Sequence, residues 1–361
     1  MRHTAWYKHQ KRVNYAQTSA ALTQWKKQDD LQFLREVSSV PLQQCLRHLQ
    51  TAFTNFFDKR AGYPKFKSRK KSRLGLEYSS SGFRFKGDDL YISRLKEPLK
   101  VVWSRDFDRG SVSMVTITKD AAGRWFVSCL GETVVKKRHV TGKTVGLDMG
   151  VKDTLVLSTG EKLSPRDDRD MEKKLAKVAK YQRRLSKKQI GSKNFAKAKT
   201  KLSKAHAQVV DARKDWIHKT TTKLVEDFDV VCIEDLNVRG MTRSARGKGR
   251  KAKAGLNRGV MSQSFAEIRR CLEYKARDCG GEVVAIDRFF PSSKTCSSCG
   301  HINTSLTLKQ RFWTCSVCDE HHDRDINAAN NIQAAGLAVF ACGDGVRPAK
   351  KPLVSKAGSR C

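Results

Sequence analysis

The sequence predicts a mixed α/β protein, and three features of its second half lead to this fold class. Short apolar segments with strand character alternate with longer segments of helical character. Two of the apolar strands end in an acidic residue, Asp148 in one and Glu234 in the other. Two Cys-x-x-Cys pairs follow, separated by fifteen residues. Alternating strands and helices are typical of a sheet covered by helices, and the paired cysteines indicate a small metal-bound insertion.

The N-terminal part of the chain has two different patterns. Residues 1–75 are expected to be helical, because apolar residues between Leu42 and Phe57 recur mostly at steps of three and four. Residues 76–140 contain short apolar runs, interrupted by turn sequences rich in glycine and aspartate. Such runs are hairpin signals. We therefore expect a helical region followed by a small antiparallel, barrel-like β domain.

The main α/β pattern occupies residues 141–288. A strand at 144–148 turns tightly into a second strand at 154–158. The later elements are expected to be a helical hairpin at 172–214 that turns near Gly191-Ser192, a buried strand at 230–236, a basic loop at 243–258, a helix at 264–279 and a strand at 282–286. Residues 289–320 hold the paired cysteines, residues 321–342 return to the α/β domain, and residues 343–361 are expected to be a disordered tail.

The chain is strongly basic, with 72 lysine and arginine residues, 36 acidic residues and a formal net charge of +36. This excess predicts a polyanionic partner, because each neutralised phosphate releases counterions. The hairpin 172–214 and the loop 243–258 concentrate the charge, and we expect both to contact nucleic-acid backbones. The candidate contacts in the loop are Arg246, Lys248, Arg250, Lys251 and Lys253. The alternatives are a solvated helix face for the hairpin and a merely soluble basic protein for the chain.

The sequence contains no recognisable export or membrane signal. Met1 is followed by polar and basic residues without the apolar core of a signal peptide. No apolar run is long enough to span a bilayer. Eleven cysteines in a chain without an export signal indicate a reducing compartment. We therefore expect a cytoplasmic protein with no membrane partner.

Three acidic residues at the ends of elements suit divalent cations. Asp148 and Glu234 each end an apolar strand, and Asp325 precedes a helix expected at 326–335. Mg²⁺ prefers oxygen ligands, and two metal ions about 3.5–4 Å apart can hydrolyse a phosphodiester. Each acid by itself is more often a turn or cap residue, so the order of strand, strand and helix supports the prediction. Near rivals are Asp153, Asp235 and Asp323.

The cysteines Cys296, Cys299, Cys315 and Cys318 have the spacing of a zinc site. Gly300 after the first pair permits a tight knuckle. Four thiolates fill a tetrahedral shell and leave no open position, so we expect a structural Zn²⁺. A redox pair of dithiols is the alternative. Other nearby residues that could ligate a metal are His301, His321 and His322.

Several of these segments resemble the TnpB (OrfB) proteins of bacterial and archaeal insertion sequences. The resemblance rests on residues 146–150, 233–236, 290–300 and 323–332, and residues 37–44 and 63–67 also fit. It covers nearly the whole chain. The order of the carboxylates, two on strands and one on a helix, is also similar to that of RNase H-like nucleases.

The resemblance implies an RNA-guided DNA endonuclease, related to the compact type V CRISPR effectors, with an RNase H-like (RuvC) domain and an inserted zinc ribbon. By motif match Asp148, Glu234 and Asp325 take the three acid positions that bind a pair of Mg²⁺ ions. Asp325 is preferred to Asp323 because it lies two residues before Asn327. Arg311 matches a supporting arginine. The implied partners are a guide RNA and target DNA, bound by a monomer in the cytoplasm of a bacterium or archaeon.

Two other functions stay open from the sequence. The first is a DNA-binding regulator on the same scaffold that does not cleave. Family members usually begin with a β segment and a helix that would precede Met1, and a truncated copy would favour this alternative. The second is a transposase or transposase accessory protein. One transposase chemistry uses a His-apolar-His metal pair with a nucleophilic tyrosine, and the sequence has no such pair.

Overall fold

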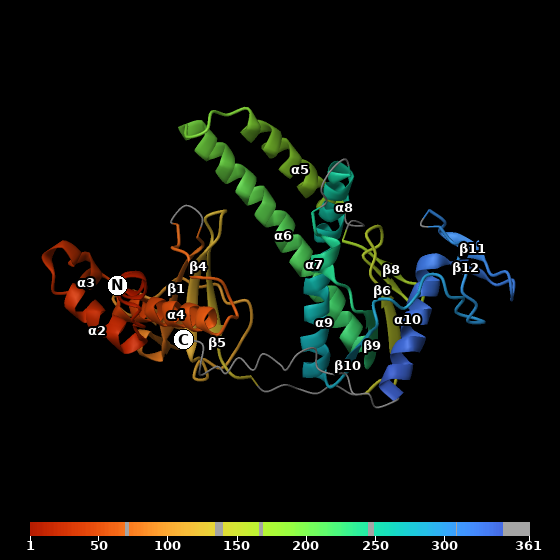
Figure 1. Cartoon of the computed structure of the whole chain (residues 1–361), viewed down its shortest axis with the longest axis horizontal. Helices are drawn as coiled ribbons and strands as arrows, with labels where there is room; N and C mark the ends of the chain where they lie inside the picture. Colours follow the sequence, from red (N-terminus) through yellow and green to blue (C-terminus); the bar gives the residue numbers. More distant parts are fainter. Residues whose placement is uncertain (69–71, 134–139, 166–168, 245–248, 308, 342–361) are drawn as a thin grey trace. The chain divides into compact units, whose positions relative to one another are not determined.

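The structure of the chain is a computed structural model that describes residues 1–68, 72–133, 140–165, 169–244, 249–307 and 309–341 (Figure 1). The described residues form two compact units, one up to residue 133 and the other from residue 140 onward. The segment 343–361, expected to be a tail, lies outside the described residues. Within the described part, no helix is both long enough and apolar enough to cross a bilayer.

The first half of the N-terminal unit is helical, as its apolar spacing predicts. Its helices are α1 (Arg2–His9), α2 (Tyr15–Trp25), α3 (Phe33–Glu36) and α4 (Ser39–Phe57), with a 3-10 turn η1 at Asp29–Leu31. The Ser38 hydroxyl caps α4 by accepting a hydrogen bond from the Val40 amide at 3.3 Å. At the other end of α4, Phe53 packs edge-on against Tyr63 at a centroid distance of 5.7 Å.

The second half of this unit is antiparallel β structure. Its strands are β1 (Leu74–Ser79), β2 (Phe83–Lys86), β3 (Asp89–Ile92), β4 (Met114–Lys119) and β5 (Trp125–Leu130), with a 3-10 turn η2 at Ser80–Gly82. One sheet has the order β1-β4-β5, and β2 pairs with β3 as a hairpin. Their shared core contains Tyr78, Leu90 and Val115. The antiparallel prediction is therefore correct, but the described strands form two separate sheets and no closed barrel.

The second unit contains a five-stranded mixed sheet with the order β10-β9-β6-β7-β8. The strands are β6 (Thr144–Asp148), β7 (Leu155–Leu157), β8 (Lys162–Leu163), β9 (Val230–Glu234) and β10 (Glu282–Ile286). β6, β9 and β10 run parallel, while β7 and β8 extend the sheet antiparallel at the far edge. The helices of the unit are α5 (Arg169–Ser186), α6 (Lys193–Asp227), α7 (Val238–Met241), α8 (Arg250–Gln263), α9 (Phe265–Cys279) and α10 (Arg324–Ala341).

Helices cover both faces of this sheet (Figure 1). On one face, Ile233 of β9 belongs to a core that includes Ile217 of α6 and Leu272 of α9. On the other face, Cys232 of β9 belongs to a core that includes Ile332 of α10. Successive residues of a strand point to opposite faces, so β9 has an apolar side chain in both directions. This burial explains why the strand is a continuous apolar run in the sequence.

The helical hairpin that the sequence predicts is formed by α5 and α6. Gly191 at the turn has a φ of +90°, in the left-handed region that favours glycine. The Ser192 hydroxyl caps α6 by accepting a hydrogen bond from the Phe195 amide at 3.0 Å. The predicted end of the hairpin at residue 214 is too early, because α6 continues to Asp227. Its last turns bury apolar residues such as Leu224 against the sheet.

The prediction of a loop over residues 243–258 is wrong in its second half. Residues from Arg250 onward belong to α8, and residues 245–248 lie outside the described part. The buried Gln263 at the end of α8 donates a hydrogen bond to the Val151 carbonyl at 2.6 Å and accepts one from the Thr154 hydroxyl at 2.6 Å. These tertiary contacts outweigh the glycines, which by themselves disfavour a helix.

The segment with the paired cysteines ends in a short antiparallel pair, β11 (Phe312–Thr314) with β12 (His321–Asp323). Trp313 and Leu306 form a small core with two of the cysteines, Cys296 and Cys315. β12 leads directly into α10. The segment with the paired cysteines is therefore an insertion between β10 and α10 of the α/β unit.

Candidate active site and metal centre

The ends of β6 and β9 bring two of the predicted acids side by side. The parallel register pairs Gly146 with Cys232 and Leu147 with Ile233, so Asp148 and Glu234 come next on neighbouring strands. Leu147 and Ile233 point into the core beneath α6 and α9. Because strand residues alternate between faces, the two acids point toward the opposite face, which α10 covers.

Close packing of α10 brings the third acid to the same place. Gly146 of β6 faces the helix, and a Cβ there would lie only 2.0 Å from the Ala329 carbonyl oxygen. Gly336 of α10 faces β9, and a Cβ there would lie 2.4 Å from the Cys232 sulfur. Asp325 lies four residues before Ala329 and so shares its helix face. The sequence reasoning missed the role of both glycines, although glycine inside a strand is a signal of close backbone approach.

The three acids interact through their charges. Burial, reinforced by the negative charges of Glu234 and Asp325, raises the pKa of Asp148 to about 7. Burial also raises the pKa of Glu234, although a hydrogen bond from Ser292 acts in the opposite direction. Both shifts mean that the folded protein disfavours the ionised carboxylates. A bound cation would remove this penalty.

Two side chains from the cysteine-bearing insertion contact these acids. The Ser292 hydroxyl donates a hydrogen bond to Glu234 Oε1 at 2.6 Å. Arg311 donates to both carboxylate oxygens of Asp325, at 2.8 and 3.1 Å. Arg311 was expected to support the site on family resemblance. Ser292 lies in the segment 290–300 that carries the resemblance, but nothing in the sequence singled it out from its neighbour Ser293.

Two of the three rival acids, Asp323 and Asp235, have other partners. Asp323 accepts a hydrogen bond from Lys162 at 2.6 Å and caps α10 by accepting from the amides of Asp325 and Ile326. Burial opposes its ionisation, but these bonds outweigh burial and lower the pKa of Asp323. Asp235 is held by two arginines. Arg269 bonds it at 2.6 Å and Arg288 forms a second ion pair, and together they lower the pKa of Asp235.

The four cysteines form a compact cluster. Their sulfur atoms all lie within 4.8 Å of one another, and the pairs Cys296–Cys318 and Cys299–Cys315 are each 3.6 Å apart. A zinc ion with Zn–S bonds of about 2.3 Å would hold tetrahedral sulfurs about 3.8 Å apart. Hydrogen bonds from the amides of Cys318 and Val317 lower the pKa of Cys315 to about 6. Despite hydrogen bonds from nearby amides, burial and the neighbouring thiols raise the pKa of Cys299 and Cys318, so without a metal the cluster favours the thiolate at Cys315.

Nearby histidines stand beside this cluster. His322 is buried, and its Nε2 lies 3.0 Å from the Cys296 sulfur, at hydrogen-bonding distance. Its ring also packs on Trp313, with the centroids 4.8 Å apart. His321 bonds the Thr314 hydroxyl through Nδ1 at 2.6 Å. Four sulfurs can complete a tetrahedral shell by themselves. Of the two histidines, His322 contacts a sulfur and His321 bonds Thr314.

Unlike the four thiols, the three acids, which all belong to the described residues, do not form a set whose ligand atoms all lie within 4.8 Å of one another. Among the described residues, the other set with all ligand atoms within 4.8 Å is His218, Glu267 and Cys271. Arg270 bonds Glu267 of that set at 2.6 Å, and burial together with Lys275 lowers the pKa of His218. The positive charges of Arg270 and Lys275 disfavour a further cation at this set, although the lowered pKa of His218 favours the neutral imidazole that could ligate a metal.

The predicted basic contacts differ in accessibility. Arg250 and Lys251 are exposed at the start of α8. Lys253 is half-buried, and its ammonium donates a hydrogen bond to the Met241 carbonyl at 2.7 Å. Arg246 and Lys248 lie outside the described residues. The exposed pair is therefore available to a partner, whereas Lys253 also anchors α8.

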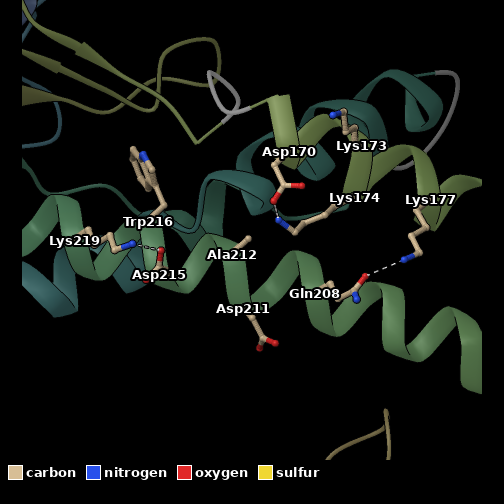
Figure 2. Close-up of a pocket in the computed structure, with 10 residues that line it drawn as sticks. All are labelled: Asp170, Lys173, Lys174, Lys177, Gln208, Asp211, Ala212, Asp215, Trp216 and Lys219. Carbon is tan, nitrogen blue, oxygen red and sulfur yellow. Dashed lines mark hydrogen bonds and ion pairs between the residues drawn. The ribbon is translucent and has the colours of Figure 1, made fainter. Parts of the chain in front are cut away.

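The hairpin has two grooves between α5 and α6 that differ in charge. The first, which we name the root groove, has a volume of about 790 Å³. Figure 2 shows that both lysines and aspartates line it, including the ion pairs Lys174–Asp170 and Lys219–Asp215. These ion pairs within the groove neutralise part of its positive charge.

The second groove, which we name the turn groove, lies closer to Gly191 and has a volume of about 430 Å³. Its cationic lining residues are Arg184, Lys187, Lys188, Lys197 and Lys201, and no acidic side chain lines it. Within the described part of the chain, these five cations form no ion pair. The turn groove therefore presents uncompensated positive charge.

Two family models match the chain. One, OrfB_IS605, is described as "Probable transposase" and matches residues 126–245. The other is described as "Cas12f1-like, TNB domain" and matches residues 265–332. The two matches together span the acids Asp148 and Glu234, the cysteine cluster and the acid Asp325.

Similar proteins are found over nearly the whole chain. A protein of Streptomyces pristinaespiralis named "Putative RNA-guided DNA endonuclease" is 48% identical over 349 residues, which are 96% of this chain and 84% of that protein. A protein of Escherichia coli K12 named "Putative RNA-guided DNA endonuclease InsQ" is 36% identical over 358 residues, covering 94% and 86%. A solved Cas12f1-sgRNA-target DNA complex gives a TM-score of 0.49 at 18% identity, covering 81% of this chain and 71% of that chain.

Proposed function

Because this chain belongs to the TnpB (OrfB) family, we propose that it is an RNA-guided DNA endonuclease with an RNase H-like (RuvC) catalytic unit. The observation that supports cleavage most directly is the convergence of Asp148, Glu234 and Asp325 from two strand ends and a helix start. Asp148 and Glu234 are half-buried with raised pKa values, so their ionised forms are costly for the fold unless a cation binds there.

The three carboxylates fit a pair of Mg²⁺ ions. All of their donor atoms are oxygen, which Mg²⁺ prefers, and the raised pKa of Asp148 shows that the site disfavours uncompensated negative charge. When bound, two such ions activate the attacking water and stabilise the leaving oxygen. The residues of the chain hold the acids in place: Ser292 bonds Glu234, and Arg311 bonds Asp325.

The four thiols fit one structural Zn²⁺. Their 3.6 Å pair distances agree with tetrahedral coordination. All four positions are filled by the chain, so this ion has no open site for water or substrate. We assign it to the stability of the insertion.

The basic surfaces fit a ribonucleoprotein. The turn groove together with Arg250 and Lys251 presents cations to a polyanion without competing acids. A guided nuclease holds the guide RNA and the heteroduplex through their backbones and leaves sequence reading to base pairing. We therefore propose that these residues contact nucleic-acid phosphates.

Cleavage should depend on RNA that copurifies with the protein. Purified protein is expected to cut a plasmid that matches this RNA, to lose cutting after RNase treatment, and to regain it when the RNA is added back. A plasmid with a scrambled target is the control. Equal cutting after RNase treatment would leave a plain metal-dependent nuclease. Tight RNA binding without cleavage in Mg²⁺ would instead favour the regulator.

The turn groove should account for more of the RNA affinity than the root groove. Changing Lys187, Lys188, Lys197 and Lys201 together to glutamine should reduce the slope of log affinity against log salt by up to about 3, because each phosphate contact contributes about 0.7–0.9. The matched control changes Lys173, Lys174, Lys177 and Lys219 of the root groove to glutamine. It removes the same charge, and a smaller reduction is expected. Equal reductions would show that only the total charge matters.

A further inference from the structure

The insertion is fastened to α10 by two asparagines. Asn331 Nδ2 donates hydrogen bonds to the carbonyls of Ser292 and Thr295, at 2.8 and 2.6 Å. One helical turn earlier, Asn327 Nδ2 donates to the Thr295 carbonyl at 2.7 Å, and its Oδ1 accepts from the Ser297 amide at 2.9 Å. Both asparagine side chains are buried, with 1% and 7% exposure for Asn327 and Asn331. The turn that contains Cys296 is thus fixed to the helix that begins with Asp325.

The same turn presents Ser292 to the acid cluster. Ser292 is buried, with 6% exposure, and its hydroxyl donates to Glu234 at 2.6 Å while its carbonyl accepts from Asn331. A serine hydroxyl rotates freely, but its reach to Glu234 is set by the backbone position that Asn331 holds. On the other side of the insertion, the Arg311 carbonyl accepts from the Arg324 amide at 2.8 Å, and the Arg311 side chain bonds Asp325.

We propose that Ser292 is a positioning residue for Glu234, that Asn331 and Asn327 act through Ser292, and that the insertion thereby sets the metal affinity of the acid cluster. The inference rests on the proposed function only in taking the three acids as the metal site. It gives the insertion a role in the nuclease centre itself, beyond holding its own fold. The four thiols and the three acids are then linked parts of one centre.

The chemistry of these contacts favours positioning over plain packing. Backbone pairing with Ile286 holds the main chain of Glu234 but leaves its side-chain torsions free. The Ser292 bond holds one carboxylate oxygen of Glu234, so the second oxygen points in a defined direction. Residues that orient metal ligands usually change metal affinity or activity by about 10- to 100-fold when replaced. If these hydrogen bonds only joined the turn to the helix, removing them would lower the stability of the protein and leave its metal affinity nearly unaltered.

Metal titration of the purified protein tests this inference without guide or DNA. The probe is Mn²⁺, which accepts oxygen ligands as Mg²⁺ does, and its binding is measured by calorimetry on protein that keeps its zinc. Ser292→Ala is expected to weaken Mn²⁺ binding by about 10- to 100-fold, and Ser292→Thr, which keeps the hydroxyl, should recover much of it. Asn331→Ala should weaken binding to a similar extent.

A double variant separates positioning from general destabilisation. If Asn331 acts through Ser292, the variant with both alanines should bind Mn²⁺ about as weakly as the weaker single variant, because coupled residues are not additive. The matched control is Gln333→Ala. Gln333 also joins α10 to a strand, since its Nε2 donates to the Thr144 carbonyl and hydroxyl at 3.0 and 2.8 Å. The Gln333→Ala variant should lower the thermal midpoint without changing Mn²⁺ affinity.

The outcomes are distinct. Unaltered Mn²⁺ binding in Ser292→Ala, or equal losses in Asn331→Ala and Gln333→Ala, would overturn the positioning role. Strong Mn²⁺ binding by the unchanged protein together with absent guided cleavage would overturn the proposed function and leave this inference standing. No Mn²⁺ binding by the unchanged protein would overturn both.

Discussion

Replacing Asp148 with alanine is expected to lower guided DNA cleavage by at least about 100-fold, the scale seen when a group that stabilises transition-state charge is removed. RNA and DNA binding should stay near that of the unchanged protein, because Asp148 is not part of the basic grooves. Single-turnover cleavage and filter binding measure the two effects separately. Undiminished cutting would contradict the assignment of Asp148.

Asp325→Ala and Asp323→Ala form a matched pair for the third acid. Asp325→Ala should abolish cleavage in the same way as the Asp148 variant. Asp323→Ala removes the cap of α10 and the Lys162 ion pair, which should lower stability by about 1 kcal/mol and reduce cleavage less. The reverse ranking would show that Asp323 is the catalytic acid.

Measuring the folding stability of these variants shows whether a variant loses cleavage because its active site is altered or because it unfolds. The pKa of Asp148 is about 7 in the folded protein and near 3.8 when unperturbed, so the folded state binds the proton more tightly than the unfolded state. The stability of the metal-free protein should therefore fall as pH rises from about 4 to about 7. Asp148→Asn should remove this loss and be the more stable form at pH 8. Lower stability of the variant at pH 8 would mean that Asp148 holds the fold together.

Loss of the zinc ligands should have the second large effect. Elemental analysis should find about one zinc per chain, and Cys299→Ser should lose it. Zinc in small structural sites contributes on the order of 10 kcal/mol of apparent binding free energy, and the small core of Trp313 and Leu306 cannot replace that amount. We expect residues 296–318 to lose protection from hydrogen exchange and the thermal midpoint to fall.

Cys45→Ser is the matched control for this experiment. Cys45 is an exposed thiol on α4, far from the cysteine cluster in the sequence. It should keep full zinc and an unchanged thermal midpoint. If Cys299→Ser also keeps full zinc and stability, the metal lies elsewhere. The zinc variant should in addition cleave DNA poorly, since Arg311 and Ser292 contact the acids from this insertion.

Several parts of the structure follow from local patterns in the sequence. The apolar strands that end in Asp148 and Glu234, the hairpin turn at Gly191 and the cysteine cluster lie where periodicity and spacing predict them. The periodicity of apolar residues reflects which side of a helix or strand is buried. The spacing of the paired cysteines reflects how closely a short turn can bring two thiols together. Both are properties of neighbouring residues, so the sequence reveals them without knowledge of the rest of the chain.

Other features depend on contacts between distant segments. α8 is helical although its own glycines favour a loop, and its last residue, the buried Gln263, bonds Val151 and Thr154. The length of α6 is likewise set by the sheet that its last turns cover. In both cases tertiary burial outweighs local propensity.

By itself, the sequence determined the types of residue available for chemistry: three acids at element ends, four paired thiols and a large excess of positive charge. The order of the acids and the resemblance already favoured Asp148, Glu234 and Asp325, but only the tertiary structure decided how these segments lie together. It brings the acids to one place through the parallel register of β6 and β9 and the close approach of α10 at Gly146. It also joined Ser292 to Glu234 across 58 residues of chain. The physical reason is that such distances depend on how strands and helices pack, and no local pattern contains that information.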